Sequence, residues 1–284
     1  NHAQTGTVAI GHSALRRLTS GTKNTAVGYL SQDYNRTGVN NTSVGEESLS
    51  QLGHDDSDNN TAVGFQAMRS AGTPNNNDAA QNVAVGSKAL TAILDGDNNT
   101  ALGYEAGKAI TTGGANVILG SFAGDGLQTT YNHVIIGYGA GSAAITNHGQ
   151  TLVGYYAGNA ITSGERNTAL GYHALSGLTV GDDNIAIGYS ALEHLGTSTH
   201  ANRNIAIGTS AMGSAADNNL SDNIAIGFSA LSQSIHSDGD NNVAIGSNTM
   251  QEMTAGAWGM VGVGVGALQK VNHADSVGST AVGY

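Results

Sequence analysis

A short motif that recurs along the whole chain constrains the fold more than any other feature of the sequence. In residues 24–28 it reads Asn-Thr-Ala-Val-Gly, and sixteen copies can be aligned on the glycine. The motif glycines are Gly11, Gly28, Gly45, Gly64, Gly86, Gly103, Gly120, Gly137, Gly154, Gly171, Gly188, Gly208, Gly227, Gly246, Gly264 and Gly283. Eight of the fifteen intervals are 17 residues long, the others are 18, 19, 20 or 22, and the extra residues precede the next Asn. Insertions confined to one phase predict a solenoid of stacked coils with surface loops.

The three residues before each motif glycine have the pattern of a β-strand. The residue just before the glycine is Val, Ile or Leu in all sixteen copies, and two positions earlier it is Val, Ile or Thr. This alternation of β-branched residues is typical of a strand with one buried face. The sequence therefore predicts a structural core that includes Ile10, Val27, Val44, Val63, Ile187, Ile207, Ile226 and Ile245. The residue between them is Ala in eleven copies, so the opposite face is expected to be tight as well.

The motif Asn and Gly predict a corner and a close approach between coils. The residue four positions before the glycine is Asn in eleven copies. Asn bonds its own backbone at corners, and stacked Asn side chains can form hydrogen bonds between layers. His133 occupies the same position and is expected to be a corner residue too. The glycine permits a bend or the close approach of a neighbouring coil.

A compensating change of volume indicates which positions touch. In three consecutive copies the usual strand Ala is replaced by Ile118, Ile135 and Leu152. In the same copies the apolar residue four positions after the glycine is replaced by Gly124, Gly141 and Gly158. Close packing requires that volume gained on one side is lost on the other. Gly107 makes the second change without the first, so the coupling is incomplete.

The composition favours many thin layers over one thick core. The chain has 42 glycines, one proline and only 5% aromatic residues in 284. A 17-residue coil is too thin to bury much by itself, and apolar residues on both strand faces imply that more than one chain shares the core. We therefore expect an all-β parallel β-roll or β-solenoid of about 16 coils of 17–22 residues, which forms a single repeat domain over residues 1–284.

Charge and cysteine content exclude several classes of function. The formal net charge is −11, so the basic surface of a nucleic-acid-binding protein is missing. No apolar run approaches the length of a membrane span, which argues against membrane insertion. The chain has no cysteine, which excludes disulfides and thiolate metal sites. No nucleophile is coupled to a base in a recognisable pocket, so we expect no enzyme and no cofactor.

The motif Asn-Thr/Ile-Ala-Val/Ile-Gly-Tyr-x-Ala-Leu resembles the head repeats of trimeric autotransporter adhesins and related repeats of bacteriophage tail fibres. The resemblance spans the chain, from residues 7–11 to residues 280–284. It implies a left-handed parallel β-roll in which three chains intertwine as a homotrimer. It also implies a segment of a longer fibre, placed outside the cell, on a cell surface or on a virion. The implied function is attachment, with a host-surface glycan or a protein as receptor.

Two other functions remain open from the sequence. Stacked coils can continue from one molecule to the next, so a self-assembling extracellular filament joined end to end is one alternative. A carbohydrate-binding or ice-binding solenoid is the other. Thr25, Thr42 and Thr61 form a short threonine row of the ice-binding kind, but they share a strand face with the apolar residues and are expected to pack inward.

Two sets of residues are candidate binding sites. Acidic corners at Asp56 and Asp58, at Asp95 and Asp97, and at Asp238 and Asp240 have oxygen spacing that suits calcium, although Asx turns explain them equally. Tyrosines follow many motif glycines, and four in adjacent coils predict an aromatic ladder: Tyr138, Tyr155, Tyr172 and Tyr189. Such a ladder could bind sugar rings or could be packing with hydroxyl groups at its rim.

Overall fold

The structure is a computed structural model, and it confirms an all-β parallel solenoid. It describes residues 5–53, 57–72, 77–193, 201–214, 220–234, 239–253, 258–271 and 277–284. Within these ranges every regular element is a β-strand, and no helix could span a membrane. The chain divides into two compact units, residues 1–146 and 147–284, where the sequence predicts a single repeat domain. Each unit contributes eight motif strands.

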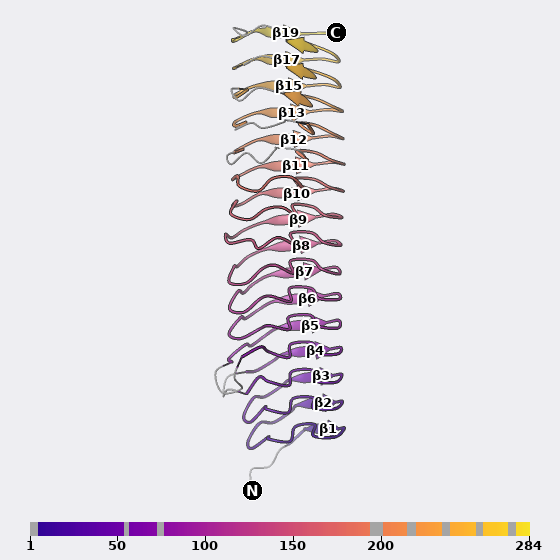
Figure 1. The fold of residues 1–284 in the computed structure, drawn as a ribbon, viewed down its shortest axis with the longest axis vertical. Helices are drawn as coiled ribbons and strands as arrows, with labels where there is room; N and C mark the ends of the chain where they lie inside the picture. The colour runs from indigo at the N-terminus through magenta and orange to yellow at the C-terminus, as the bar shows by residue number, and fades with distance from the viewer. Residues whose placement is uncertain are drawn as a thin grey trace. The chain divides into compact units, whose positions relative to one another are not determined.

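Each of the sixteen motif copies forms one three-residue strand, and successive strands of each unit lie one above another (Figure 1). The strands of the first unit are β1 (Val8–Ile10), β2 (Thr25–Val27), β3 (Thr42–Val44), β4 (Thr61–Val63), β5 (Val83–Val85), β6 (Thr100–Leu102), β7 (Val117–Leu119) and β8 (Val134–Ile136). The motif strands of the second unit are β9 (Thr151–Val153), β10 (Thr168–Leu170), β11 (Ile185–Ile187), β12 (Ile205–Ile207), β13 (Ile224–Ile226), β15 (Val243–Ile245), β17 (Val261–Val263) and β19 (Thr280–Val282). Three shorter strands form a second parallel sheet in that unit: β14 (Gln233–Ser234), β16 (Glu252–Met253) and β18 (Lys270–Val271).

The parallel register places every motif position above the same position of the next coil. In the first pair, Val8 lies beside Thr25, Ala9 beside Ala26 and Ile10 beside Val27. Strands separated by a longer interval keep this register too: Ile185 of β11 lies beside Ile205 of β12. Each side chain therefore belongs to a row that runs from coil to coil.

The interior of each coil is made of small and medium apolar side chains. Outside the first and the last two coils, the strand Ala is fully buried, as are the Ala three positions after the motif glycine and most of the Leu and Met residues that follow it. A second branched residue, such as Ile93 or Ile110, completes the interior. A 17-residue coil encloses little volume, so Ala fits the strand position where Leu or Met follows in the same coil, and a larger strand residue fits where that Leu or Met is replaced by glycine.

Buried Asn side chains form a ladder along one corner, as the sequence predicts. Asn184 Oδ1 accepts a hydrogen bond from the backbone N–H of Asn204 at 3.0 Å. Asn184 Nδ2 donates to the carbonyl of Ala201 at 2.6 Å and to Asn167 Oδ1 at 3.0 Å. Asn side chains at this position in other coils make the same contacts. We call this row the Asn ladder. It satisfies backbone groups that would otherwise be buried without partners. His133 occupies its place, with its backbone N–H bonded to Asn116 Oδ1 at 3.0 Å.

The coil turns through left-handed backbone angles at fixed positions. In the coil that contains β2, Lys23, Leu30 and Gln32 have φ of 58°, 55° and 50°. The motif glycine is required for a different reason. A Cβ added to Gly28 would lie 2.5 Å from the carbonyl oxygen of Gly45, which belongs to the next coil. The predicted close approach is therefore confirmed, and any larger residue would force neighbouring coils apart.

The structure also confirms the volume compensation and explains its apparent exception. A Cβ on Gly158 would lie 2.6 Å from Leu152 Cδ2, and a Cβ on Gly124 would lie 3.4 Å from Ile118 Cδ1. Gly107 has no large strand residue in its own coil. A Cβ there would lie 3.0 Å from Ile118 Cδ1, which belongs to the next coil. Ile118 therefore needs glycine in two coils.

One region replaces the apolar interior with a polar network. Ser31, Gln32, Ser43 and Ser48 are buried in positions where most coils have Ala or Leu. Gln32 Nε2 donates to the Thr25 carbonyl at 2.9 Å and to Ser43 Oγ at 3.0 Å. The hydroxyls of Ser31 and Ser43 are 2.5 Å apart. The interior thus tolerates polar residues where each polar group has a partner.

Candidate functional site

The outward side of the motif sheet carries two rows of partly exposed, uncharged side chains. In each strand the central residue points inward, so the residues three and one positions before the motif glycine point outward. We call these two outward rows the outer face. In every copy they are Val, Ile, Leu or Thr, and none is charged. Many are substantially exposed, including Leu102 at 49% and Leu170 at 48%.

The predicted structural core is therefore wrong for the single chain. Ile10 is 60% exposed, Val44 is 40% exposed, and Val63 and Ile245 are each 37% exposed. The other four predicted core residues are half-buried: Val27, Ile187, Ile207 and Ile226. The sequence correctly predicts one buried face but assigns it to the larger residues. In most coils Leu or Met after the motif glycine fills the interior, so Ala occupies the inward strand position; Ile118, Ile135 and Leu152 occupy it where that Leu or Met is replaced by glycine.

The threonine row belongs to this outer face too. Thr25, Thr42 and Thr61 lie on strands β2, β3 and β4, and each is half-buried with its side chain on the outward side. The expectation that they pack inward is wrong for the same reason. Ice binding by this row stays a prediction.

Three of the four tyrosines in the predicted ladder stack in the second unit. The ring centroids of Tyr155 and Tyr172 are 4.9 Å apart with an interplanar angle of 10°, and those of Tyr172 and Tyr189 are 5.3 Å apart at 9°. Tyr138 belongs to the first unit, where its ring meets Phe122 edge-on at 5.7 Å. The stacked rings cover each other's faces, so they present their rims to solvent. This geometry favours packing over sugar binding at Tyr172.

The ladder extends sideways through a second aromatic row. His173 stacks on Tyr172 with a centroid distance of 4.5 Å and lies 5.8 Å from Tyr156. Its Nδ1 is 3.3 Å from Glu193 Oε1. The cluster therefore joins three coils through ring contacts and one polar contact.

The acidic corners use their carboxylates to hold the neighbouring coil. Asp58 Oδ1 accepts a hydrogen bond from the Val39 N–H at 2.7 Å, and Asp240 Oδ1 accepts one from the Ser221 N–H at 2.7 Å. Asp97 makes the equivalent contact, and Asp95 makes a similar one. This is the Asx explanation extended from one coil to the next. Calcium binding stays a prediction there.

The described part of the chain contains no cluster of metal-binding side chains at the predicted calcium corners. Asp56 and Asp238 lie outside the described residues. In the part of the chain that the structure describes, no three His, Asp or Glu side chains come together in a way that could hold a metal ion. Asp95 and Asp97 instead border a surface hollow of about 290 Å³, which also involves Tyr131.

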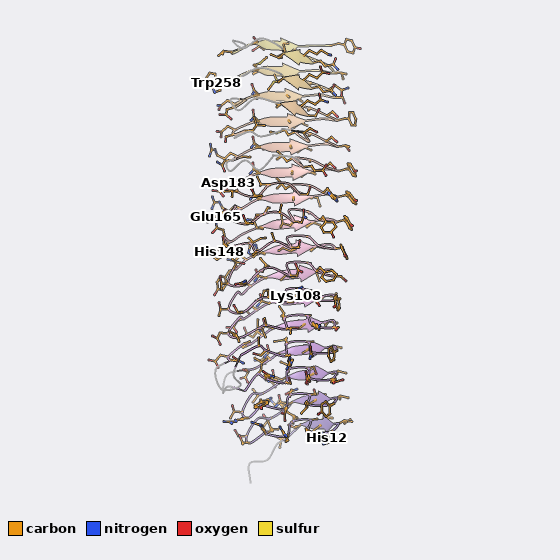
Figure 2. All side chains as sticks on the ribbon, viewed as in Figure 1. His12, Lys108, His148, Glu165, Asp183 and Trp258 are labelled. Carbon is orange, nitrogen blue, oxygen red and sulfur yellow. The ribbon has the colours of Figure 1, made fainter. Side chains whose placement is uncertain are left out.

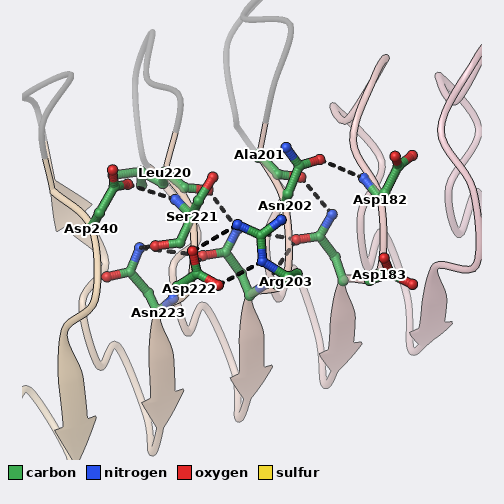
Figure 3. Close-up of polar contacts among 12 residues, drawn as sticks. Asp182, Asp183, Ala201, Asn202, Arg203, Leu220, Ser221, Asp222, Asn223 and Asp240 are labelled. Atoms are coloured by element: carbon green, nitrogen blue, oxygen red, sulfur yellow. Dashed lines mark hydrogen bonds and ion pairs between the residues drawn. The ribbon is translucent and has the colours of Figure 1, made fainter.

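Opposite charges alternate along one exposed corner of the second unit. Figure 2 shows His148, Glu165, Asp183 and Trp258 on this edge. The row five positions before the motif glycine reads Arg166, Asp183, Arg203 and Asp222. Arg166 Nε is 2.7 Å from Asp183 Oδ1. Arg203 Nε is 2.6 Å from Asp222 Oδ1 (Figure 3). The row therefore links successive coils through their side chains.

These contacts displace the pKa values of the charged groups. The hydrogen bonds from Arg166 lower the pKa of Asp183, and those from Arg203 lower the pKa of Asp222. In the first unit, a hydrogen bond from Lys108 lowers the pKa of Glu105. All of these groups lie in surface ion pairs rather than in a pocket. The displacements therefore reflect surface charge pairing, between coils for Asp183 and Asp222 and within one coil for Glu105, which is a structural role.

Three features were not predicted from the sequence: the row of alternating Arg and Asp, the polar interior around Gln32, and the surface hollow beside Tyr131. Alignment of the row five positions before the glycine would have revealed the alternation of Arg and Asp. The polar interior was visible as Ser31, Gln32 and Ser43 in Ala and Leu positions. The hollow could be found only in the structure, because it depends on the position of the Tyr131 ring over the backbone of Gly114 in the preceding coil.

Comparison with known proteins gave no match: no family model matches the sequence, and no curated protein or solved structure was matched. The chemical character of the site therefore rests on geometry alone. An uncharged outer face, polar corners bonded between coils and surface ion pairs are suited to association and binding.

Proposed function

We propose that this chain is a structural fibre module whose copies associate as a homotrimer and that the fibre serves attachment to a cell or surface. The supporting observation is the outer face, which runs along the motif strands of each unit as two uncharged, half-exposed rows. Parallel sheets are ordinarily covered on both faces, and large exposed apolar surfaces mark interaction sites.

A second copy of the same chain is the partner that fits this face best. Covering the face requires a partner whose apolar residues recur with the same coil spacing. An identical chain in parallel register supplies that spacing in both rows. The absence of charge in these rows means that like charges of an acidic chain would not meet there. The number of three chains, the left-handed winding and the location on a cell or virion surface derive from the resemblance to adhesin and tail-fibre repeats.

The proposal assigns binding rather than catalysis to the chain. Association of the copies would bury the outer face. The polar corners would stay exposed and available to a receptor. That receptor would be a glycan or protein on a host surface. No cofactor takes part in the proposed role, and calcium at the acidic corners is not required for it.

Disulfide crosslinking tests this assignment directly, since the natural chain has no cysteine. Ile245→Cys places a thiol on the outer face, and Asn241→Cys places one at the exposed corner of the same coil. Under oxidising conditions at low protein concentration, the face variant should form interchain disulfides rapidly and the corner variant should not. Equal crosslinking of both variants, or none at the face, would count against association through the outer face. Binding of the purified assembly to intact cells then tests the attachment role.

A further inference from the structure

A notch interrupts the regular corner of the first unit. Six positions before the motif glycine, three successive coils carry Asp97, Gly114 and Tyr131. Gly114 has no side chain to continue the row, and its neighbour Ala115 has only a methyl group. The coil between the acidic residues and the tyrosine is therefore recessed at this corner. We call this recess the corner notch.

Gly114 lets the tyrosine ring lie close to the backbone. A Cβ added to Gly114 would lie 3.3 Å from Cδ1 and Cε1 of Tyr131 and 2.8 Å from the carbonyl oxygen of Asp97. The Tyr131 hydroxyl donates a hydrogen bond to the Thr112 carbonyl at 2.9 Å. The ring thus lies over Gly114 with its hydroxyl anchored to Thr112, and 42% of Tyr131 remains exposed. It forms an oriented aromatic surface beside the notch.

Two carboxylates face the same hollow and are themselves oriented. Asp97 Oδ1 accepts a hydrogen bond from the Ala80 N–H at 2.7 Å. Asp95 Oδ1 accepts one from the Asp78 N–H at 3.2 Å. One oxygen of each carboxylate is therefore held by the preceding coil, while the other can accept a hydrogen bond from a ligand. Asn98, which is exposed, adds an amide to the rim.

The hollow has the size of a small ligand site. Its volume is about 290 Å³, near the lower end of ligand pockets in general. The lining combines an aromatic ring with carboxylate, amide and hydroxyl groups contributed by Asp95, Asp97, Asn98, Thr112 and Tyr131. These groups come from three successive coils. The succession Asp97, Gly114 and Tyr131 six positions before the motif glycine occurs nowhere else in the chain. The repeat itself therefore does not require it, which favours a local role such as ligand binding.

We propose that the corner notch is a saccharide-binding subsite that accepts one pyranose ring of a glycan. The proposal rests on the attachment function above and names its receptor class. The apolar face of a pyranose would lie against Tyr131, and its hydroxyls would donate to Asp95 and Asp97. Asn98 both donates and accepts, which matches a ligand rich in hydroxyls better than a metal ion or a simple ammonium group. A corner position keeps the subsite clear of the outer face.

A printed glycan array probed with the fluorescently labelled protein provides the test. Calorimetric titration with the strongest free oligosaccharide follows, for the natural chain and four variants. Tyr131→Ala and Asp97→Asn should each weaken binding at least tenfold. Tyr131→Phe retains the ring and should bind within about threefold of the natural chain. Asn at position 97 can keep the bond to the preceding coil, as Asn202 does with the Asp182 N–H at 2.8 Å in the same row.

Asp58→Asn is the matched control, because Asp58 occupies the same row and makes the same backbone contact without a neighbouring tyrosine. It should leave affinity unchanged. The proposal is overturned if no glycan binds, or if binding survives Tyr131→Ala and Asp97→Asn. It is also overturned if calcium chloride or tetramethylammonium chloride binds at Tyr131 and no oligosaccharide does. Light scattering on the same samples reports assembly separately, so loss of the subsite and loss of the trimer are distinguishable.

Discussion

The inner and outer faces of the motif strands are both apolar, but only the inner face is complete within one chain. Ala26 and Ala186 on the inner face are fully buried, while Val44 and Leu170 on the outer face are 40% and 48% exposed. The inner residues are small because a single coil must close around them. The outer residues are larger, as expected of side chains that fill space between molecules. The difference supports the proposal that the outer face, unlike the inner one, is covered by a second copy of the chain.

The largest expected effect comes from charge on the outer face. Ile187→Asp combined with Ile207→Asp places carboxylates where we propose that copies meet, so assembly should be lost. The single-chain fold should persist, because both side chains point away from the coil interior. Light scattering should give the mass of one chain, and circular dichroism should keep its β signal. Ile187→Val with Ile207→Val is the control and should assemble normally. An aspartate variant with the natural oligomeric mass would refute an interface at this face.

The second effect is expected from the interior Asn ladder. Asn184→Ala removes the partners of the Asn204 N–H and the Ala201 carbonyl. Each orphaned buried group costs about 1–3 kcal/mol, so the free energy of unfolding should fall by several kcal/mol. Urea denaturation measures this loss. Asn98→Ala provides the comparison at an exposed corner, where Ala115 already occupies the equivalent position, and should change stability by about 0.5 kcal/mol or less. Similar losses in the two variants would contradict the structural role of the ladder.

A third experiment separates packing inside the coil from contacts outside it. Gly158→Leu should destabilise by about 1–3 kcal/mol, because its Cβ would lie 2.6 Å from Leu152 Cδ2. Leu152→Ala should destabilise by about 2–5 kcal/mol through a cavity. The double variant restores the Ala and Leu pairing of most coils, and its loss should be much smaller than the sum. Strictly additive losses in denaturation would show that these positions do not share one space.

The smallest effect is expected at the solvent-exposed corner that carries Arg166, Asp183, Arg203 and Asp222. The folded-state pKa values of Asp183 and Asp222 are lowered from 3.8 by their arginine partners. The stabilisation is therefore present above the unfolded pKa and is lost as the pH falls through the folded pKa. Arg166→Ala with Arg203→Ala should lower the Tm slightly at pH 7, and the difference from the natural chain should shrink as the pH falls below 3.8. One molar salt should also reduce it. A difference that grows on acidification would reverse the assigned sign.

Much of the fold was predictable because the repeat aligns equivalent residues. The strand positions, the close approach at the motif glycine and the Asn ladder all follow from the chemistry of single positions. The pairing of Leu152 with Gly158 was also readable, because volume must be conserved. Which side of each strand faces the coil interior was not predictable, because alternation gives the same pattern whichever side is buried. The burial of Ala26 in the structure shows which side it is.

The candidate site was less predictable, because it depends on contacts between rows rather than along them. The sequence predicted that Tyr155, Tyr172 and Tyr189 stack and left open whether the ladder binds sugar rings or is packing; the stacking distances decide in favour of packing at Tyr172. It placed Asp95 and Asp97 together without the ring of Tyr131, which lies more than thirty residues later. That ring reaches the site because two 17-residue coils return the chain to the same corner.

The native mass of the unmodified protein tests the central claim most directly. Light scattering over a range of dilutions should give a stable species of three times 28.5 kDa, because the outer faces would be buried against each other. A monomer that stays soluble at all concentrations would contradict the claim, since the outer face would then need no partner.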